Sequence, residues 1–157
     1  MSANEIIPNL WLGDHVAAQS SEFFNRMNIQ LIVNCSKDIP FSEDLPKGCK
    51  KIRIPVHDNL KEEEINHLSE WSFKIITNIW DEYKQGKPVF IHCYAGVQRS
   101  AAVVAMFLIF YFRCSVDEAV KKIRQRRPIA FQPKINFLKS IYFFERGIND
   151  ELKRSFN

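Results

Sequence analysis

The segment Val89–Phe112 (VFIHCYAGVQRSAAVVAMFLIFYF) joins an apolar strand pattern to an apolar helix pattern through a short loop. Val89-Phe90-Ile91 is β-rich and follows the turn signal Gly86-Lys87-Pro88, while Ala101–Phe112 is long enough for about three helical turns. The residues between them, His92–Ser100, therefore form a strand–loop–helix junction. Such a junction directs backbone N–H groups and a helix N-terminus to one point, which favours binding of an anion such as phosphate.

Upstream of this junction, strand patterns alternate with helix patterns. Short β-rich runs predict strands within Ile6–Leu12, Leu31–Cys35 and Lys51–Val56. A helix with an N-terminal aspartate cap is expected over Asp14–Met27. Apolar residues at three- and four-residue steps predict a long amphipathic helix over Glu62–Tyr83.

Two further helices are expected downstream. Ser115 and Glu118 form a capping box that starts a helix through Ile123, which must end before Pro128. Pro133 is expected to start the last helix, with a polar tail that frays from about residue 150. Basic residues near the end of the first of these helices predict a solvated helix face, namely Lys121, Lys122, Arg124, Arg126 and Arg127.

The composition and the order of these elements indicate the fold class. With 157 residues, of which 46% are hydrophobic and 13% aromatic, the chain can bury the core of one domain. Alternating strands and helices predict a single α/β domain over residues 1–157, with a mainly parallel central sheet of about five strands and helices on both faces. The net charge of +4 comes from dispersed charges of both signs, so we expect no nucleic-acid partner.

The cysteines and the chain start bear on the cellular compartment. The four cysteines, Cys35, Cys49, Cys93 and Cys114, form no CxxC pair and have no neighbouring histidines at metal-ligand spacing, so no metal and a reducing compartment are expected. The chain opens without a signal segment, and Ala101–Phe112 is too short to span a bilayer. We therefore expect a soluble intracellular protein of the cytoplasm, the nucleus or both, without a membrane partner. The sequence leaves the oligomeric state open and favours a monomer.

The loop of the junction carries residues suited to phosphoryl transfer. Cys93 precedes a helix N-terminus, where the thiol pKa falls and a nucleophilic thiolate forms. Arg99 offers a planar fork of donors that matches two phosphate oxygens and retains its charge during transfer. Gly96 suits the tight part of the loop, where the backbone must approach the ligand or take positive φ, and the Ser100 hydroxyl can donate to the cysteine sulfur. His92 is expected to orient the loop by hydrogen bonds rather than to act as a base.

These residues resemble the signature of a known enzyme family. HCYAGVQRS at His92–Ser100 is similar to the HCxxGxxRS loop of the cysteine-dependent protein phosphatases, and specifically of their compact dual-specificity branch. The resemblance extends to Ile7–Gly13, to Ile32–Cys35 and to Arg127-Pro128, Phe137 and Phe144-Glu145 near the end. It implies a cysteinyl-phosphate mechanism without metal or other cofactor, and a site at the C-terminal ends of the strands.

The resemblance also assigns roles to residues outside the loop. It places the general acid at Asp58, just past a strand end, where the acid would protonate a poor alkoxide leaving group. Asn34 resembles a position that braces the phosphate loop by hydrogen bonds, a supporting role that it would share with His92. The phosphate-binding loop itself would comprise Tyr94, Ala95, Gly96, Val97, Gln98 and Arg99.

The sequence predicts hydrolysis of phosphotyrosine and of phosphoserine or phosphothreonine in protein substrates. One alternative is a phosphatase of RNA 5′-phosphates or phosphoinositides with the same loop, and another is a non-catalytic adaptor that binds phosphate. The loop rim, assigned to Tyr94, Val97 and Gln98, is uncharged, unlike the basic loops of many RNA or lipid phosphatases. Whether another cysteine regulates Cys93 by oxidation is left open.

Overall fold

A single mixed sheet forms the centre of the protein. The computed structural model describes residues 2–156, with side chains for residues 2–154. The sheet has the strand order β1-β2-β5-β3-β4. The β1–β2 pair is antiparallel and the other neighbouring pairs are parallel, which confirms the predicted mainly parallel sheet. The strands are β1 Ala3–Ile7, β2 Leu10–Gly13, β3 Leu31–Asn34, β4 Lys50–Arg53 and β5 Val89–His92.

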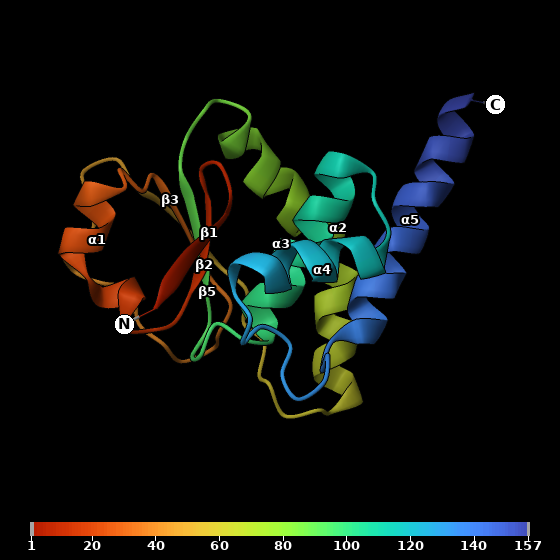
Figure 1. Cartoon of the computed structure of the whole chain (residues 1–157), viewed down its shortest axis with the longest axis horizontal. Helices are drawn as coiled ribbons and strands as arrows, with labels where there is room; N and C mark the ends of the chain where they lie inside the picture. Colours follow the sequence, from red (N-terminus) through yellow and green to blue (C-terminus); the bar gives the residue numbers. More distant parts are fainter. Residues whose placement is uncertain (1, 157) are drawn as a thin grey trace.

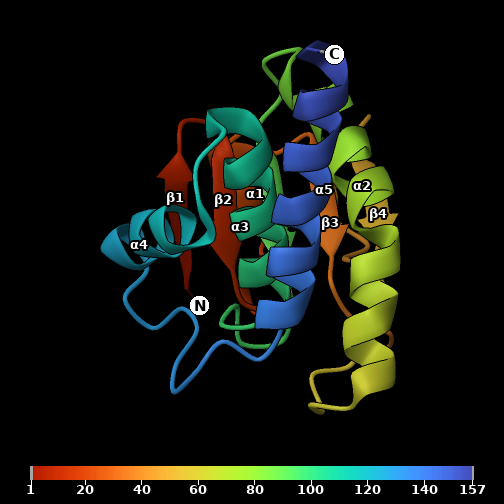
Figure 2. The same cartoon turned by 90° about the vertical axis from the view of Figure 1, so that its right-hand side faces the viewer.

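Helices cover both faces of this sheet, as predicted, but unequally. α1 packs on one face together with a short 3₁₀ turn, and the other four helices pack on the opposite face (Figure 1). In the view of Figure 2, α3, α5 and α2 lie side by side in front of the sheet. The helices are α1 Ser21–Arg26, α2 Glu62–Tyr83, α3 Arg99–Phe112, α4 Val116–Arg126 and α5 Leu138–Phe156, and the 3₁₀ turn is η1 Ala17–Gln19.

The alternation of side chains along β5 explains the two layers. Val89 and Ile91 point into the larger core with α2 and α3, whereas Phe90 packs in the smaller core against Phe23 and Phe24 of α1. Successive residues of a strand face opposite sides of a sheet, so a strand that is apolar throughout needs cover on both sides. The same alternation directs Cys93, the next residue after the strand, to the side of the larger core.

α3 is the most buried helix of the larger layer. Its residues from Ser100 to Ile109 are all buried, which accounts for the nearly continuous apolar sequence there. Within residues 2–156, no single helix is long and apolar enough to span a membrane, and α3 and α4 meet that test only as a pair bent by 118°.

The predicted helix over Asp14–Met27 is wrong, because the chain forms two shorter elements there. Asp14 accepts a hydrogen bond from the Ala17 N–H (2.9 Å) at the start of the 3₁₀ turn, whose N-cap position is Val16, and it starts no long helix. Ser20 then breaks the run in an extended conformation and caps α1 through its hydroxyl. A second, weaker cap signal therefore lies within the predicted helix.

The C-terminal helix also differs from its prediction at both ends. α5 begins at Leu138 instead of Pro133, because the preceding residues form a loop. At the other end the helix continues to Phe156 instead of fraying from residue 150. Asn157 lies outside the described residues. By contrast, the capping box of Ser115 and Glu118 at the start of α4 is confirmed.

Candidate active site

Cys93 lies where β5 ends, beside the first turn of α3. Its side chain is buried, and its Sγ lies 3.1 Å from the Oγ of Ser100. A hydroxyl at this distance can donate to a thiolate and stabilise its charge. The strand–loop–helix junction expected from the sequence therefore brings these two residues together.

The backbone of the loop between them carries unpaired donors. No backbone N–H from Tyr94 to Gln98 donates a hydrogen bond within the described part of the chain. Gly96 has a φ of 70°, and a Cβ at this position would overlap the carbonyl group of Gly13, so only glycine fits the turn. A run of free N–H groups at a helix N-terminus is the typical environment for a phosphate.

Arg127 binds the carbonyl oxygens of this loop. Its guanidinium donates to the carbonyl oxygens of Ala95 (3.0 Å) and Gly96 (2.8 Å). In a trans peptide the C=O and N–H point in opposite directions, so these bonds turn the following N–H groups away from Arg127. The same guanidinium also donates to Asn4 Oδ1 and Ser2 Oγ, and so connects the loop to the N-terminal segment.

The expected solvated face of basic residues is therefore wrong for Arg127, whose exposure is only 1%. Arg124 likewise donates to the Ala130 and Phe131 carbonyls. Arg127 is the C-cap of α4 and has a non-helical backbone, so the helical spacing of the basic run did not indicate its burial.

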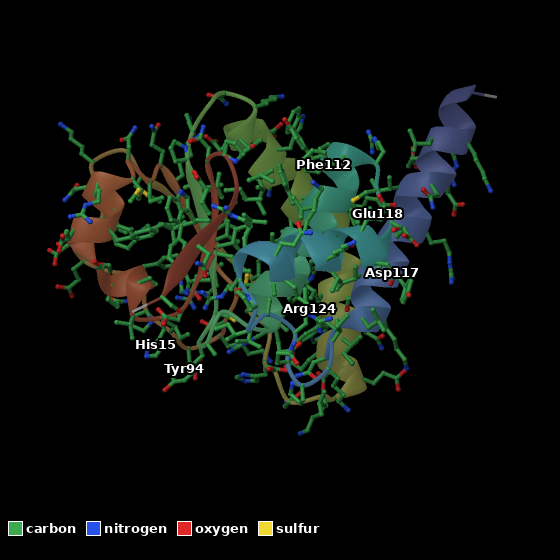
Figure 3. All side chains as sticks on the ribbon, in the orientation of Figure 1. His15, Tyr94, Phe112, Asp117, Glu118 and Arg124 are labelled. Carbon is green, nitrogen blue, oxygen red and sulfur yellow. The ribbon has the colours of Figure 1, made fainter. Side chains whose placement is uncertain are left out.

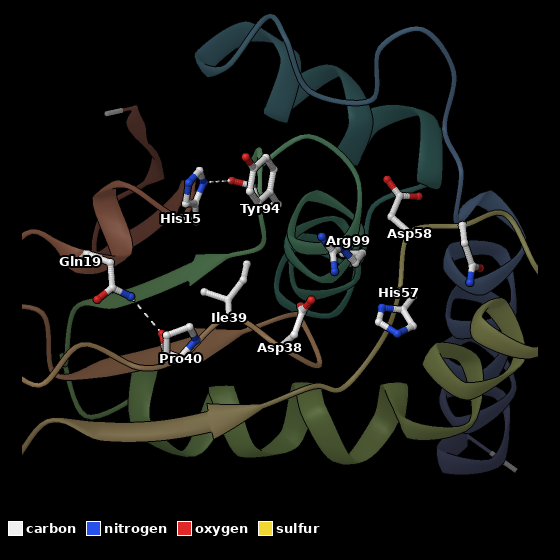
Figure 4. Close-up of a pocket in the computed structure, with 10 residues that line it drawn as sticks. His15, Gln19, Asp38, Ile39, Pro40, His57, Asp58, Tyr94 and Arg99 are labelled. Carbon is white, nitrogen blue, oxygen red and sulfur yellow. Dashed lines mark hydrogen bonds between the residues drawn. The ribbon is translucent and has the colours of Figure 1, made fainter.

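Arg99 is the first residue of α3, and its side chain extends into the cleft (Figure 4). Its Nη1 donates to the carbonyl oxygen of Val56 (3.0 Å), which fixes the guanidinium near the segment that leads to Asp58. The Nε of Arg99 is buried and has no hydrogen-bond partner among the described residues. Buried donors of this kind are usually paired, and a phosphate oxygen would provide the missing acceptor.

Asp58 lines the same cleft as Arg99. The cleft has a volume of about 580 Å³, within the range of ligand sites. The carboxylate is exposed, and its Oδ1 accepts a hydrogen bond from the Asn136 side chain (2.9 Å). The cleft is lined by His15, Gln19, Asp38, Ile39, Pro40, His57, Asp58, Asn59, Tyr94 and Arg99.

The rim of the cleft includes an aromatic pair that the sequence did not indicate. The rings of His15 and Tyr94 are stacked with centroids 4.1 Å apart, and His15 Nδ1 lies 2.9 Å from the Tyr94 carbonyl oxygen. Figure 3 shows the two side chains together at one edge of the molecule. Gln98, in contrast, is buried and points away from the rim toward residues 132–136. Its assignment to the rim is therefore wrong.

The two supporting residues expected from the sequence are buried and do not line the cleft. His92 is buried, and its Nδ1 lies 3.2 Å from the Cys93 carbonyl oxygen. Burial lowers the pKa of His92 to about 4, so the ring is neutral near pH 7 and is poorly suited to act as a cation. Asn34 has other partners than the phosphate loop, since its side chain bonds Ser36 Oγ (2.6 Å) and the Ile39 carbonyl oxygen (2.8 Å).

The three remaining cysteines lie in surroundings that disfavour a thiolate. Burial raises the pKa of Cys35 well above its ordinary value, and it also raises the pKa values of Cys49 and Cys114. Each of these thiols therefore forms less of the reactive thiolate. All four cysteines are free thiols, and residues 2–156 contain no group of three or more His, Cys, Asp or Glu side chains that could hold a metal ion.

A buried thiol, a loop of unpaired backbone donors and an arginine with an unpaired donor together form a site suited to a phosphate group beside a cysteine. Residues 10–147 match the family described as the dual specificity phosphatase catalytic domain. This match spans most of the chain, and the protein belongs to this family. The resemblance inferred from the HCYAGVQRS loop is therefore confirmed.

Individual relatives agree with the family assignment. Human dual specificity protein phosphatase 1 is 32% identical over 144 residues, which cover 92% of this chain and 37% of that protein. The tyrosine-protein phosphatase vhp-1 of Caenorhabditis elegans is 27% identical over 89% of this chain and 20% of its own length. The chain thus spans only about a fifth to just over a third of these curated relatives.

Solved structures match over nearly their whole length. Human DUSP28 has a TM-score of 0.80 with 25% identity, covering 94% of this chain and 95% of that one. A mouse putative dual specificity phosphatase, complexed with zinc tungstate, has a TM-score of 0.79 with 26% identity, covering 96% of this chain and 90% of that one. The fold of the chain is therefore that of a dual-specificity phosphatase domain.

The lowered pKa of His92 predicts a pH-dependent stability. Between about pH 6.5 and 4 the unfolded chain binds a proton at this position and the folded chain does not, so stability is present above this window and is lost as the pH falls through it. We expect the free energy of unfolding to fall by about 3 kcal/mol more in the wild type than in His92→Asn between about pH 7 and 4. Urea unfolding at a series of pH values measures this difference, and parallel curves for the two proteins would contradict it.

Proposed function

We propose that the protein hydrolyses phosphate monoesters of tyrosine and of serine or threonine in protein substrates, through a phosphorylated Cys93. The observation that carries the proposal is the coincidence of three features at one loop. The Cys93 thiol contacts the Ser100 hydroxyl, the loop N–H groups are unpaired, and the Nε of Arg99 lacks an acceptor. Each of these groups acquires a partner when a phosphate monoester binds.

In the first step the Cys93 thiolate attacks phosphorus. A sulfur–phosphorus bond forms while the bond from phosphorus to the leaving oxygen breaks, and Asp58 donates its proton to that oxygen. The loop N–H groups and the Arg99 guanidinium stabilise the charge on the equatorial oxygens. The Arg99 guanidinium can reach a phosphate that is bound at the loop, because Arg99 is the first residue of α3 and the loop leads into this helix.

In the second step water attacks the cysteinyl phosphate. The Asp58 carboxylate accepts a proton from this water as the oxygen–phosphorus bond forms, and the sulfur leaves as a thiolate. The hydroxyl of Ser100, 3.1 Å from Sγ, stabilises the charge on the leaving sulfur. Inorganic phosphate is released, and Asp58 is again protonated.

The family and the named relatives favour protein substrates. The curated relatives are named as dual specificity and tyrosine-protein phosphatases, and none of those reported above is named as an RNA or lipid phosphatase. The RNA and phosphoinositide alternatives are therefore not favoured. Arg99 and Asp58 line the cleft, and Cys93 contacts Ser100 at the adjoining loop, so the groups needed for turnover are present. This favours hydrolysis over an adaptor that only binds phosphate.

Replacement of the nucleophile tests the chemistry directly. Cys93→Ser should abolish phosphate release from phosphotyrosine and phosphothreonine peptides, because a serine hydroxyl is not ionised near pH 7 and is a far weaker nucleophile. Cys49→Ser, which changes a half-buried cysteine outside the cleft, is the matched control and should retain wild-type turnover. Turnover by Cys93→Ser would contradict the proposed mechanism.

Replacement of the acid should separate catalysis from binding. Asp58→Asn cannot donate the proton to a phenolate or alkoxide, so kcat on a phosphotyrosine peptide should fall by about 10²–10⁴-fold. KM should change by less than about threefold, because the amide preserves the size of the side chain. Steady-state kinetics measure both constants, and a kcat within about twofold of wild type would show that another group supplies the proton.

A further inference from the structure

We infer that Asn136 is a positioning residue for Asp58, and that Gln98 of the phosphate loop holds Asn136 in place. The inference rests on the proposed function and adds to it a physical connection between the nucleophile loop and the acid. Asn136 lies in the loop before α5, and no feature of the phosphate-loop sequence points to it. The connection is read from a chain of hydrogen bonds among these three residues.

Gln98 forms the first part of this connection. It is the last residue before α3 and is 6% exposed. Its Nε2 donates to the carbonyl oxygens of Gln132 (3.2 Å) and Lys134 (2.6 Å), and its Oε1 accepts from the Asn136 backbone N–H (3.0 Å). One buried amide thus satisfies three backbone groups of a segment that has no helix or strand of its own. The segment from 132 to 136 is therefore fixed relative to the phosphate loop.

Asn136 forms the second part. Its backbone is held by Gln98, and its side-chain Nδ2 donates to Oδ1 of Asp58 at 2.9 Å. This bond engages one oxygen of the carboxyl group and leaves Oδ2 to carry the proton for the leaving group. When the carboxylate later accepts a proton from water, the same orientation serves the reverse transfer.

The surroundings of Asp58 explain why such a contact matters. Residues 57–60 are all exposed, and Leu60 adopts a positive φ of 61°. The other hydrogen bonds in this loop involve its backbone, with the His57 N–H donating to Glu64 Oε2 (3.4 Å) and the Lys61 N–H donating to Asn59 Oδ1 (3.0 Å). Within residues 2–156, Asn136 alone forms a hydrogen bond with the carboxylate of Asp58.

An exposed aspartate without this contact would sample several rotamers, and only some would place its proton at the leaving oxygen. Small misplacements of a catalytic group lower rates strongly, because a catalyst depends on orientation. The effect should depend on the leaving group. A poor leaving oxygen needs the proton, whereas a strongly acidic phenol leaves readily without it.

Asn136→Ala should therefore lower kcat by about 3–10-fold on phenyl phosphate and on a phosphotyrosine peptide, the change expected from loss of one hydrogen bond. On 2,4-dinitrophenyl phosphate, kcat should stay within about twofold of wild type. Asn149→Ala makes the same substitution at an exposed site of α5 and is the matched control, with wild-type rates on all three substrates. An equal loss on every substrate, or no loss on any, would overturn the inference.

A double-mutant cycle isolates the connection to Asp58. In the Asp58→Asn background, Asn136→Ala should change kcat by less than about twofold, because the group that it positions can no longer donate a proton. Gln98→Ala should also lower kcat on substrates with poor leaving groups more than on 2,4-dinitrophenyl phosphate. The kcat of the double variant Gln98→Ala/Asn136→Ala should be no lower than that of the slower single variant. If the substitutions lowered kcat independently, so that the fold-losses of the single variants multiplied in the double variant, the inference would be overturned. Failure of the proposed function would differ, since wild-type protein would then release no phosphate.

Discussion

The phosphate loop depends on one buried guanidinium. Arg127 donates to two loop carbonyls and to two polar groups of the N-terminal segment, and it is almost completely buried. Burial of a charged group is costly unless its hydrogen bonds are satisfied, and here two of the four partners are loop carbonyls. These bonds orient the N–H groups that follow Ala95 and Gly96, and they lie at the turn where Gly96 approaches Gly13.

The site combines a rigid part and an exposed part. Cys93, Ser100 and the loop are fixed between β5 and the buried start of α3, so the nucleophile and the phosphate donors share one rigid unit. Asp58 lies on an exposed loop after β4, far away in sequence. Hydrogen bonds donated by side chains connect the two parts, since Arg99 donates to the Val56 carbonyl oxygen and Asn136 donates to the Asp58 carboxylate.

Much of this arrangement could be predicted from the sequence, because it depends on patterns among residues that are close together in the chain. The alternation of apolar runs predicted the layers and the mainly parallel sheet, and α2 has the predicted bounds. The loop motif predicted the Cys93–Ser100 pair and the positive φ of Gly96. The long helix from Asp14 failed because Ser20, inside the predicted stretch, is extended and caps a separate short helix.

The residues that were missed act through contacts between distant parts of the chain. Arg127 looked like one more cation in a basic run, and only the packing of α4 against the N-terminal segment shows that it is buried. The roles of Gln98 and Asn136 depend on a loop that the sequence assigned to a helix. Hydrogen bonds between residues far apart in the chain produce no periodic pattern in the sequence. Each of these residue types is also common in helices and loops, so none stands out by itself.

In the proposed mechanism the phosphoryl group is transferred to the sulfur of Cys93. Mass spectrometry of protein quenched with acid during turnover of a phosphotyrosine peptide tests this transfer. We expect one added phosphoryl group on the proteolytic fragment that contains Cys93. It should accumulate further in Asp58→Asn with a substrate that has a good leaving group, because the first step then outpaces hydrolysis of the intermediate. Turnover without any phosphorylated Cys93, or with phosphate on another residue, would rule out the cysteinyl-phosphate mechanism.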